Sequence, residues 1–167
     1  MACLALFPIQ PMSSNIKSFF AGFSYAIKGI RTAIQTERNM RVHVCVASYV
    51  LFFSLFYPFG AIEYALLFLC IGGVIALELV NTAIEQAVKQ PDPAHWRAAG
   101  IAKDVAAGAV LVYSIAAVAI GVALFWQPLV LMQMIRWFSK HSIACILLAV
   151  SLFLSIHFIF NTKRKGK

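Results

Sequence analysis

Residues 78–104 read ELVNTAIEQAVKQPDPAHWRAAGIAKD and decide how the rest of the chain is interpreted. The stretch begins inside one strongly apolar run and ends where another begins. It contains four of the six acidic residues of the chain: Glu78, Glu85, Asp92 and Asp104. A carboxylate at the edge of a membrane is costly unless it is paired, solvated or bound to a cation. We therefore expect a functional site here.

The polar residues at the start of this stretch fall on one side of a helix. Glu78, Asn81 and Glu85 are spaced i, i+3 and i+7, which places them within roughly 60° of one another. Lys89, at i+11, is predicted on the same stripe. Two interpretations are open here. One is a polar stripe that holds membrane helices together. The other is a site for Mg²⁺, which prefers oxygen ligands and commonly also binds phosphate oxygens.

The composition indicates a membrane protein. Of the 167 residues, 62% are hydrophobic and only 12% are charged, and the mean hydropathy is +0.84. Such values predict several membrane spans rather than a soluble core. The net charge of +8 is better explained by membrane topology than by nucleic-acid binding, because the basic residues stand at the ends of apolar runs. The four cysteines show no metal-ligand spacing, so we expect free thiols.

The apolar runs divide the chain into segments. We expect a basic amphipathic helix at the membrane surface over residues 13–38, because its apolar residues recur at helical spacing. Membrane spans are predicted at 42–59, 61–88, 103–126 and 142–160. A loop at 90–102, broken by two prolines, and an interfacial connector at 127–141 join them.

The distribution of positive charge predicts the topology. With the N-terminus inside, twelve of the fourteen Lys and Arg residues lie on the inner side, and only Arg136 and Lys140 lie outside. Basic residues are retained on the cytoplasmic side of membranes. The chain is therefore predicted as a multi-pass protein of the bacterial inner membrane with both termini cytoplasmic. Glu37, Glu85 and Asp104 then lie on the cytoplasmic side.

Two sequence blocks carry a family resemblance. ELVNTAIE (residues 78–85) and AKDVAAGAVL (residues 102–111) resemble the signature of the prokaryotic diacylglycerol kinase family, and most closely its undecaprenol kinase branch. The match extends upstream to YAIKGIRTAIQTERNMRVH (residues 25–43). Together the similarity covers about residues 17–127, without a gap.

The resemblance implies a fold and an assembly. It predicts an all-α integral membrane fold with an N-terminal amphipathic surface helix, a three-span kinase-like bundle and one extra C-terminal transmembrane helix. The expected divisions are a tail at 1–12, a diacylglycerol kinase-like domain at 13–127, and a connector, extra span and basic tail at 128–167. The family also implies a homotrimer with composite sites.

The resemblance further assigns roles to individual residues. Glu78 is similar to the family's catalytic base, and Asn81 is expected to orient Glu78 or a phosphate oxygen. The residues similar to the family's metal ligands are Glu37 and Glu85, which would hold Mg²⁺ between the nucleotide phosphates. The expected nucleotide contacts are Tyr25, Glu37, Glu85, Lys103 and Asp104.

Lys89 departs from the family pattern, which usually has an acidic residue there. Lys89 is expected either to pair with Glu85 at i+4 spacing, which would weaken its hold on Mg²⁺, or to contact a phosphate directly. Asp92, in the loop, is a candidate to replace the missing acid in part.

The function that follows from the resemblance is phosphorylation of a membrane lipid alcohol by ATP with Mg²⁺, with undecaprenol favoured and diacylglycerol next. The alternative is a catalytically impaired, kinase-like scaffold or assembly subunit, which Lys89 and the extra span favour. A channel or transporter ranks third, because no inverted repeat is visible in the sequence.

Overall fold

The computed structural model describes residues 12–89 and 95–161. These residues form α-helices and, within those ranges, no strand. The all-α integral membrane class predicted from the sequence is thus confirmed. The helices are α1 (Met12–Thr36), α2 (Arg38–Ser54), α3 (Ala61–Ala87), α4 (Trp96–Phe125), α5 (Pro128–Lys140) and α6 (Ser142–Phe160).

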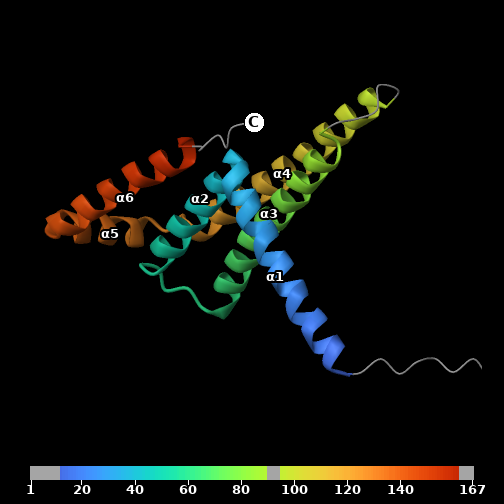
Figure 1. Cartoon of the computed structure of the whole chain (residues 1–167). Helices are drawn as coiled ribbons and strands as arrows, with labels where there is room; N and C mark the ends of the chain where they lie inside the picture. Colours follow the sequence, from blue (N-terminus) through green and yellow to red (C-terminus); the bar gives the residue numbers. More distant parts are fainter. Residues whose placement is uncertain (1–11, 90–94, 162–167) are drawn as a thin grey trace, which may run out of the picture.

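Helices α3 and α4 form the centre of the fold. Figure 1 shows them as a long antiparallel pair, with α2 packed against α3 and with α5 and α6 forming a hairpin to one side. The buried residues of α3 are Leu67, Cys70, Val74, Glu78, Asn81 and Thr82. Their spacing marks one continuous stripe. The stripe is apolar in the middle of the helix and polar from Glu78 onward.

A glycine in α3 sets how closely α4 approaches. The hydroxyl of Tyr113, on α4, donates a 3.1 Å hydrogen bond to the carbonyl oxygen of Leu69. The Tyr113 ring therefore crosses the backbone of α3 at Gly73, and a β-carbon at Gly73 would overlap its hydroxyl and ring atoms. Small residues at such crossings allow close helix packing in membranes.

An aromatic cluster joins the turn between α2 and α3 to the C-terminal end of α4. The Tyr57 ring lies 4.8 Å from Phe125 and 5.1 Å from Phe59, measured between centroids. The Tyr57 hydroxyl also donates to the carbonyl oxygen of Phe125 over 3.1 Å. Helix α3 starts beside this cluster, where the Gly60 N–H donates to the Glu63 carboxylate over 2.8 Å. These contacts fix the α2–α3 turn against the last turn of α4.

The C-terminal hairpin packs on the outer face of α2. The Tyr49 hydroxyl lies 3.1 Å from the hydroxyl of Ser151 and 3.0 Å from that of Ser155, both on α6. Phe56, just after α2, contacts Trp137 and Phe138 on α5, with ring centroids 5.4 Å and 5.7 Å apart. Among the described residues, α6 therefore has its main contacts with α2 and α5.

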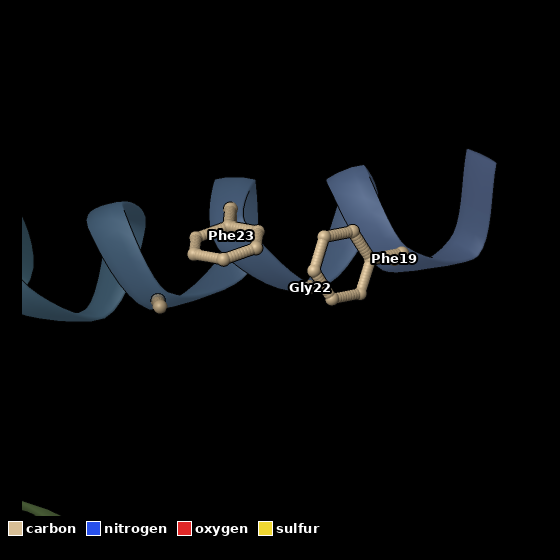
Figure 2. A pocket seen from close by; sticks show the side chains of 4 residues that line it. Phe19, Gly22 and Phe23 are labelled. Carbon is tan, nitrogen blue, oxygen red and sulfur yellow. The ribbon is translucent and has the colours of Figure 1, made fainter. Parts of the chain in front are cut away.

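Helix α1 leaves its apolar face uncovered. Phe19 and Phe23 are exposed, and their rings meet edge to face at 5.1 Å. Figure 2 shows both rings on the same side of the helix, with Gly22 between them in the sequence. The second half of α1 contacts α2 and α3. Such an exposed apolar face fits a helix that lies in the membrane interface.

The observed bounds correct several expected ones. Three of the helices that the structure describes, α3, α4 and α6, are long and apolar enough to cross a membrane. The span expected at 42–59 is α2, whose 17 residues extend for about 25 Å, less than the ~30 Å hydrocarbon core of a bilayer. The surface helix ends at Thr36 instead of residue 38, because Glu37 has an extended backbone.

The loop expected at 90–102 and the connector are also more helical than predicted. Helix α4 already begins at Trp96, so residues expected in the loop form its first turns. The connector is the amphipathic helix α5, with Pro128 in its first turn, a position that suits the fixed φ angle of proline.

Gly73 and Gly72 give a matched test of the α3–α4 crossing. Gly73→Ala should lower the free energy of unfolding in detergent by about 1–3 kcal/mol, because the new β-carbon displaces Tyr113. Gly72→Ala should not, since nothing lies within 4 Å of that position. Equal stability of the two variants would contradict the crossing described here.

Candidate functional site

The polar end of the α3 stripe is buried. Glu78 is only 1% exposed, and Asn81 and Thr82 are 7% exposed each. They occupy the helix positions that continue Val74 and Leu67, so the stripe that packs α3 into the bundle also carries these polar groups inward. A buried carboxylate within a helix otherwise long and apolar enough to cross a membrane is a functional-site hypothesis by default.

Glu78 and Asn81 open onto a small cavity, which we call the polar pocket. Its volume is about 280 Å³. Helix α2 contributes Asn39, Val42 and His43, and helix α4 contributes Ala107, Val110, Leu111 and Ser114. The pocket therefore lies where α2, α3 and α4 meet, at the level where the bundle changes from polar to apolar.

Three buried polar atoms in this pocket have no hydrogen-bond partner among the residues described. They are Glu78 Oε2, Asn81 Oδ1 and Ser114 Oγ. Leaving a buried polar group unpaired costs about 1–3 kcal/mol. Native proteins keep such groups unpaired only for a reason, such as binding a ligand. The convergence of three of them points to a polar ligand.

The other two expected carboxylates lie near Glu78. Glu37 and Glu85 are close enough to interact electrostatically with it. Glu37 stands between α1 and α2, and its side chain makes no capping hydrogen bond to α2. Its carboxylate is therefore not used to end or start a helix. Glu37 and Glu85 thus lie within electrostatic range of Glu78.

A bound metal ion requires several donor atoms close together. No group of three or more His, Cys, Asp or Glu side chains close enough to hold a metal occurs within residues 12–89 and 95–161. Glu37 and Glu85 would supply two carboxylates. Two carboxylates together with substrate phosphates are the usual ligands of Mg²⁺, which seldom has an all-protein cage. The carboxylates of Glu37 and Glu85 therefore fit the chemistry of a Mg²⁺ site that takes its other ligands from a substrate.

A second cavity lies between α1 and α3. Tyr25 and Lys28 line it from α1, and Thr82 and Gln86 line it from α3. Thr82 Oγ1 is buried and has no hydrogen-bond partner in the part of the chain that the structure covers. Tyr25 therefore lies next to the polar end of α3.

Lys103 and Asp104 lie outside both cavities. Both are exposed on the early turns of α4 and line neither of these two cavities. Asp104 precedes Ala107 by three residues and Leu111 by seven. It therefore lies on the same stripe of α4 that lines the polar pocket, nearer the start of the helix.

The stripe position predicted for Lys89 is wrong. Helix α3 ends at Ala87, and Lys89 is exposed two residues beyond that end. Pro91 follows closely, and a proline cannot continue a helix. Asp92, suggested as a replacement acid, lies outside the described residues.

The sequence did not single out His43, Ser114 or Asn39 as members of the site. Ser114 is an isolated polar residue within a long apolar run, and His43 stands at the start of another such run, which is distant in sequence. An isolated polar residue in a membrane helix was the available signal, because such residues usually face the bundle interior. Only the packing of three helices shows that they share a cavity with Glu78.

Comparison with known proteins gives concordant results. The family model for prokaryotic diacylglycerol kinase matches residues 24–125. The undecaprenol kinase of Bacillus subtilis (strain 168) is 39% identical over 116 residues, which cover 70% of this chain and 94% of that protein. The diacylglycerol kinase of Synechocystis sp. (strain ATCC 27184 / PCC 6803 / Kazusa) is 39% identical over 113 residues, or 67% of this chain and 65% of that protein.

No solved structure matches the chain. The matched region contains Tyr25, Glu37, Glu78, Asn81 and Glu85, and it ends at the last residue of α4, so α5 and α6 lie beyond it. On the extent of the family match and on the identity to the Bacillus subtilis protein, the chain belongs to the prokaryotic diacylglycerol kinase family.

Proposed function

We propose that the protein transfers the γ-phosphate of ATP to the hydroxyl group of a membrane lipid alcohol, with Mg²⁺ and at the cytoplasmic face of the membrane. The observation that carries this proposal is the buried Glu78 carboxylate, which opens with an unpartnered oxygen onto the polar pocket. Undecaprenol is the favoured acceptor and diacylglycerol the next, in line with the two relatives at 39% identity.

Glu78 would act as the base. The acceptor hydroxyl enters the polar pocket and donates its proton to the Glu78 carboxylate. As that proton leaves, the alcohol oxygen attacks the γ-phosphorus, and the bond from this phosphorus to the β–γ bridging oxygen breaks, which releases ADP. General-base assistance of this kind contributes about 10²–10⁴-fold to the rate. Asn81, on the next turn toward Glu85, orients Glu78 or a phosphate oxygen.

Glu37 and Glu85 are the residues that would hold Mg²⁺. When bound with ATP, Mg²⁺ neutralises the charge of the phosphates. The nucleotide would lie beside α1, near Tyr25 and Lys28, since that cavity adjoins the polar end of α3. Phosphoryl transfer needs mainly positioning and charge neutralisation, and these residues supply both.

The proposed topology has both termini in the cytoplasm of a bacterial cell. It requires α2 to cross the membrane, although it is short. The apolar residues that follow α2, up to Phe59, lengthen the hydrophobic segment, and a bilayer thins locally around a short span. We also propose a homotrimer, as in the family resemblance. The exposure of Lys103 and Asp104 on one chain supports a site completed by a second copy.

Removing the proton acceptor tests the base. Glu78→Gln keeps the shape of the side chain but should lower kcat by about 10²-fold or more, with the amount of folded protein unchanged. Glu63→Gln, at the other end of the same helix, is the control and should retain normal turnover. Near-normal turnover of Glu78→Gln would rule out Glu78 as the base.

The Mg²⁺ dependence tests the two metal ligands. Glu37→Gln and Glu85→Gln should each raise the Mg²⁺ concentration needed for half-maximal activity, because each removes one of two carboxylates. Titration of Mg²⁺ at saturating ATP measures the shift. If neither variant changes that concentration, the assignment of Glu37 and Glu85 fails.

Lys89 separates the active kinase from the degenerate-site alternative. Lys89 is exposed beyond the end of α3, and in an active kinase we expect it to contact a phosphate. Lys89→Ala should raise the KM for ATP, and Lys89→Asp should raise it further. A gain in Mg²⁺-dependent kcat for Lys89→Asp would instead favour a degenerate site that the lysine neutralises.

A further inference from the structure

Helix α5 carries polar and cationic side chains that the candidate active site does not use. Gln133, Arg136 and Lys140 are spaced i, i+3 and i+7, so they lie within roughly 60° of one another, and all three are exposed. We call these three residues the basic face of α5. The half-buried residues of the helix lie on its other side and are Val130, Leu131, Met134 and Phe138. The basic face therefore points away from the hairpin.

Aromatic contacts fix the level at which α5 lies. Trp137 contacts Phe56, just after the end of α2, with ring centroids 5.4 Å apart. Helix α5 begins three residues after Phe125, the last residue of α4, and Phe125 itself packs against Tyr57. Glu85, by contrast, lies near the C-terminal end of α3. The basic face is therefore at the end of the bundle opposite the candidate active site.

The positive charge of the basic face has little to balance it. No Asp or Glu occurs in residues 105–167. At this end of the bundle the structure describes one acidic residue, Glu63, whose carboxylate accepts a hydrogen bond from the Gly60 N–H at the start of α3. Arg136 and Lys140 are four residues apart, a spacing at which like charges on a helix repel each other. An anion bound between them would remove this repulsion.

The surroundings of the basic face select a lipid as the source of that anion. Helix α5 connects α4 and α6, which are both long and apolar enough to cross a membrane. Beside the cations, the apolar side chains of Leu129 and Ile135 are 72% and 64% exposed. Trp137 is of the residue type that gathers at the level of lipid headgroups. A molecule with a phosphate and hydrocarbon chains matches this combination, whereas a soluble anion would leave Leu129 and Ile135 uncovered.

We propose that the basic face of α5 binds the headgroup of an anionic phospholipid in the leaflet opposite the candidate active site. Arg136 Nε donates to the carbonyl oxygen of Met132 over 3.4 Å, which holds the guanidinium along the helix. Its two terminal nitrogens can then donate to two oxygens of one phosphate. Lys140 adds a charge one turn further on, and the acyl chains lie along Leu129 and Ile135. This interaction depends neither on the kinase reaction nor on its acceptor.

Trp137 provides a local reporter of the lipid around the basic face. The other two tryptophans, Trp96 and Trp126, are exposed, so replacing both with Phe leaves Trp137 alone with little loss of packing. The full chain with these two substitutions is reconstituted in phosphatidylcholine vesicles that contain either brominated phosphatidylglycerol or brominated phosphatidylcholine. Bromine quenches tryptophan fluorescence only at short range. The ratio of quenching by the two lipids therefore measures the local enrichment of the anionic lipid.

The anionic lipid should be enriched near Trp137 by about fivefold for each cation that contacts the headgroup, and salt should reduce the enrichment. Arg136→Gln combined with Lys140→Gln should abolish it. Arg136→Lys combined with Lys140→Arg keeps both charges and should retain most of it. Equal quenching by the two lipids in the single-tryptophan parent would overturn the proposal. Enrichment that survives the double glutamine change, or that is lost in the charge-retaining variant, would also overturn it.

Arg38→Gln combined with Arg97→Gln is the matched control. It removes the same number of charges from exposed positions at the first residue of α2 and the second residue of α4, at the other end of the bundle. Enrichment near Trp137 should equal that of the parent protein. A loss as large as that of the α5 variant would show that the net charge of the chain attracts the lipid, and would overturn a site on α5.

Thermal unfolding gives a measurement that does not use the fluorescence of Trp137. A ligand that binds only the folded protein stabilises it. Replacing part of the phosphatidylcholine by phosphatidylglycerol should therefore raise the Tm of the unmodified protein more than that of the variant with Arg136→Gln and Lys140→Gln. An equal rise in Tm for the two proteins would contradict the proposed site.

Discussion

The arrangement of this bundle depends on one costly feature, the carboxylate of Glu78 held within a helix that is otherwise apolar enough to cross a membrane. Burial of such a group is opposed by the loss of its hydration, and in a membrane helix it is tolerated only where it faces other protein groups or a cavity. Here it lies on the same stripe as Leu67, Cys70 and Val74. The residues that pack α3 into the bundle therefore also fix where Glu78 points.

The remaining helices are placed around this stripe. Helix α4 approaches α3 closely because Gly73 leaves space for the Tyr113 ring. Helix α2 closes the third side of the polar pocket with Asn39 and His43. Glu37, in the break between α1 and α2, adds a second carboxylate from the membrane surface. The added α5–α6 hairpin contacts α2 through Tyr49, away from the pocket.

Much of the site could be predicted from the sequence because its central residues lie close together on one helix. Helical spacing alone placed Glu78, Asn81 and Glu85 on one stripe, and the family resemblance added Glu37. The same spacing failed for Lys89, because the helix ends before it. Hydropathy located α3, α4 and α6. It placed the C-terminal end of α2 too late and missed the first turns of α4, because the ends of helices depend on local backbone geometry. His43 and Ser114 became visible only because α2 and α4 line one cavity with α3, which periodicity within one segment cannot reveal.

The most direct test is transfer of label from ATP to lipid by the purified protein. The protein is reconstituted in vesicles that contain undecaprenol, diacylglycerol or neither, and radiolabelled γ-phosphate is followed into the lipid fraction with and without Mg²⁺. We expect Mg²⁺-dependent label in a phosphorylated lipid, more with undecaprenol than with diacylglycerol. Absence of labelled lipid from every alcohol, in protein that is folded and intact, would contradict the assignment of this chain as a lipid kinase.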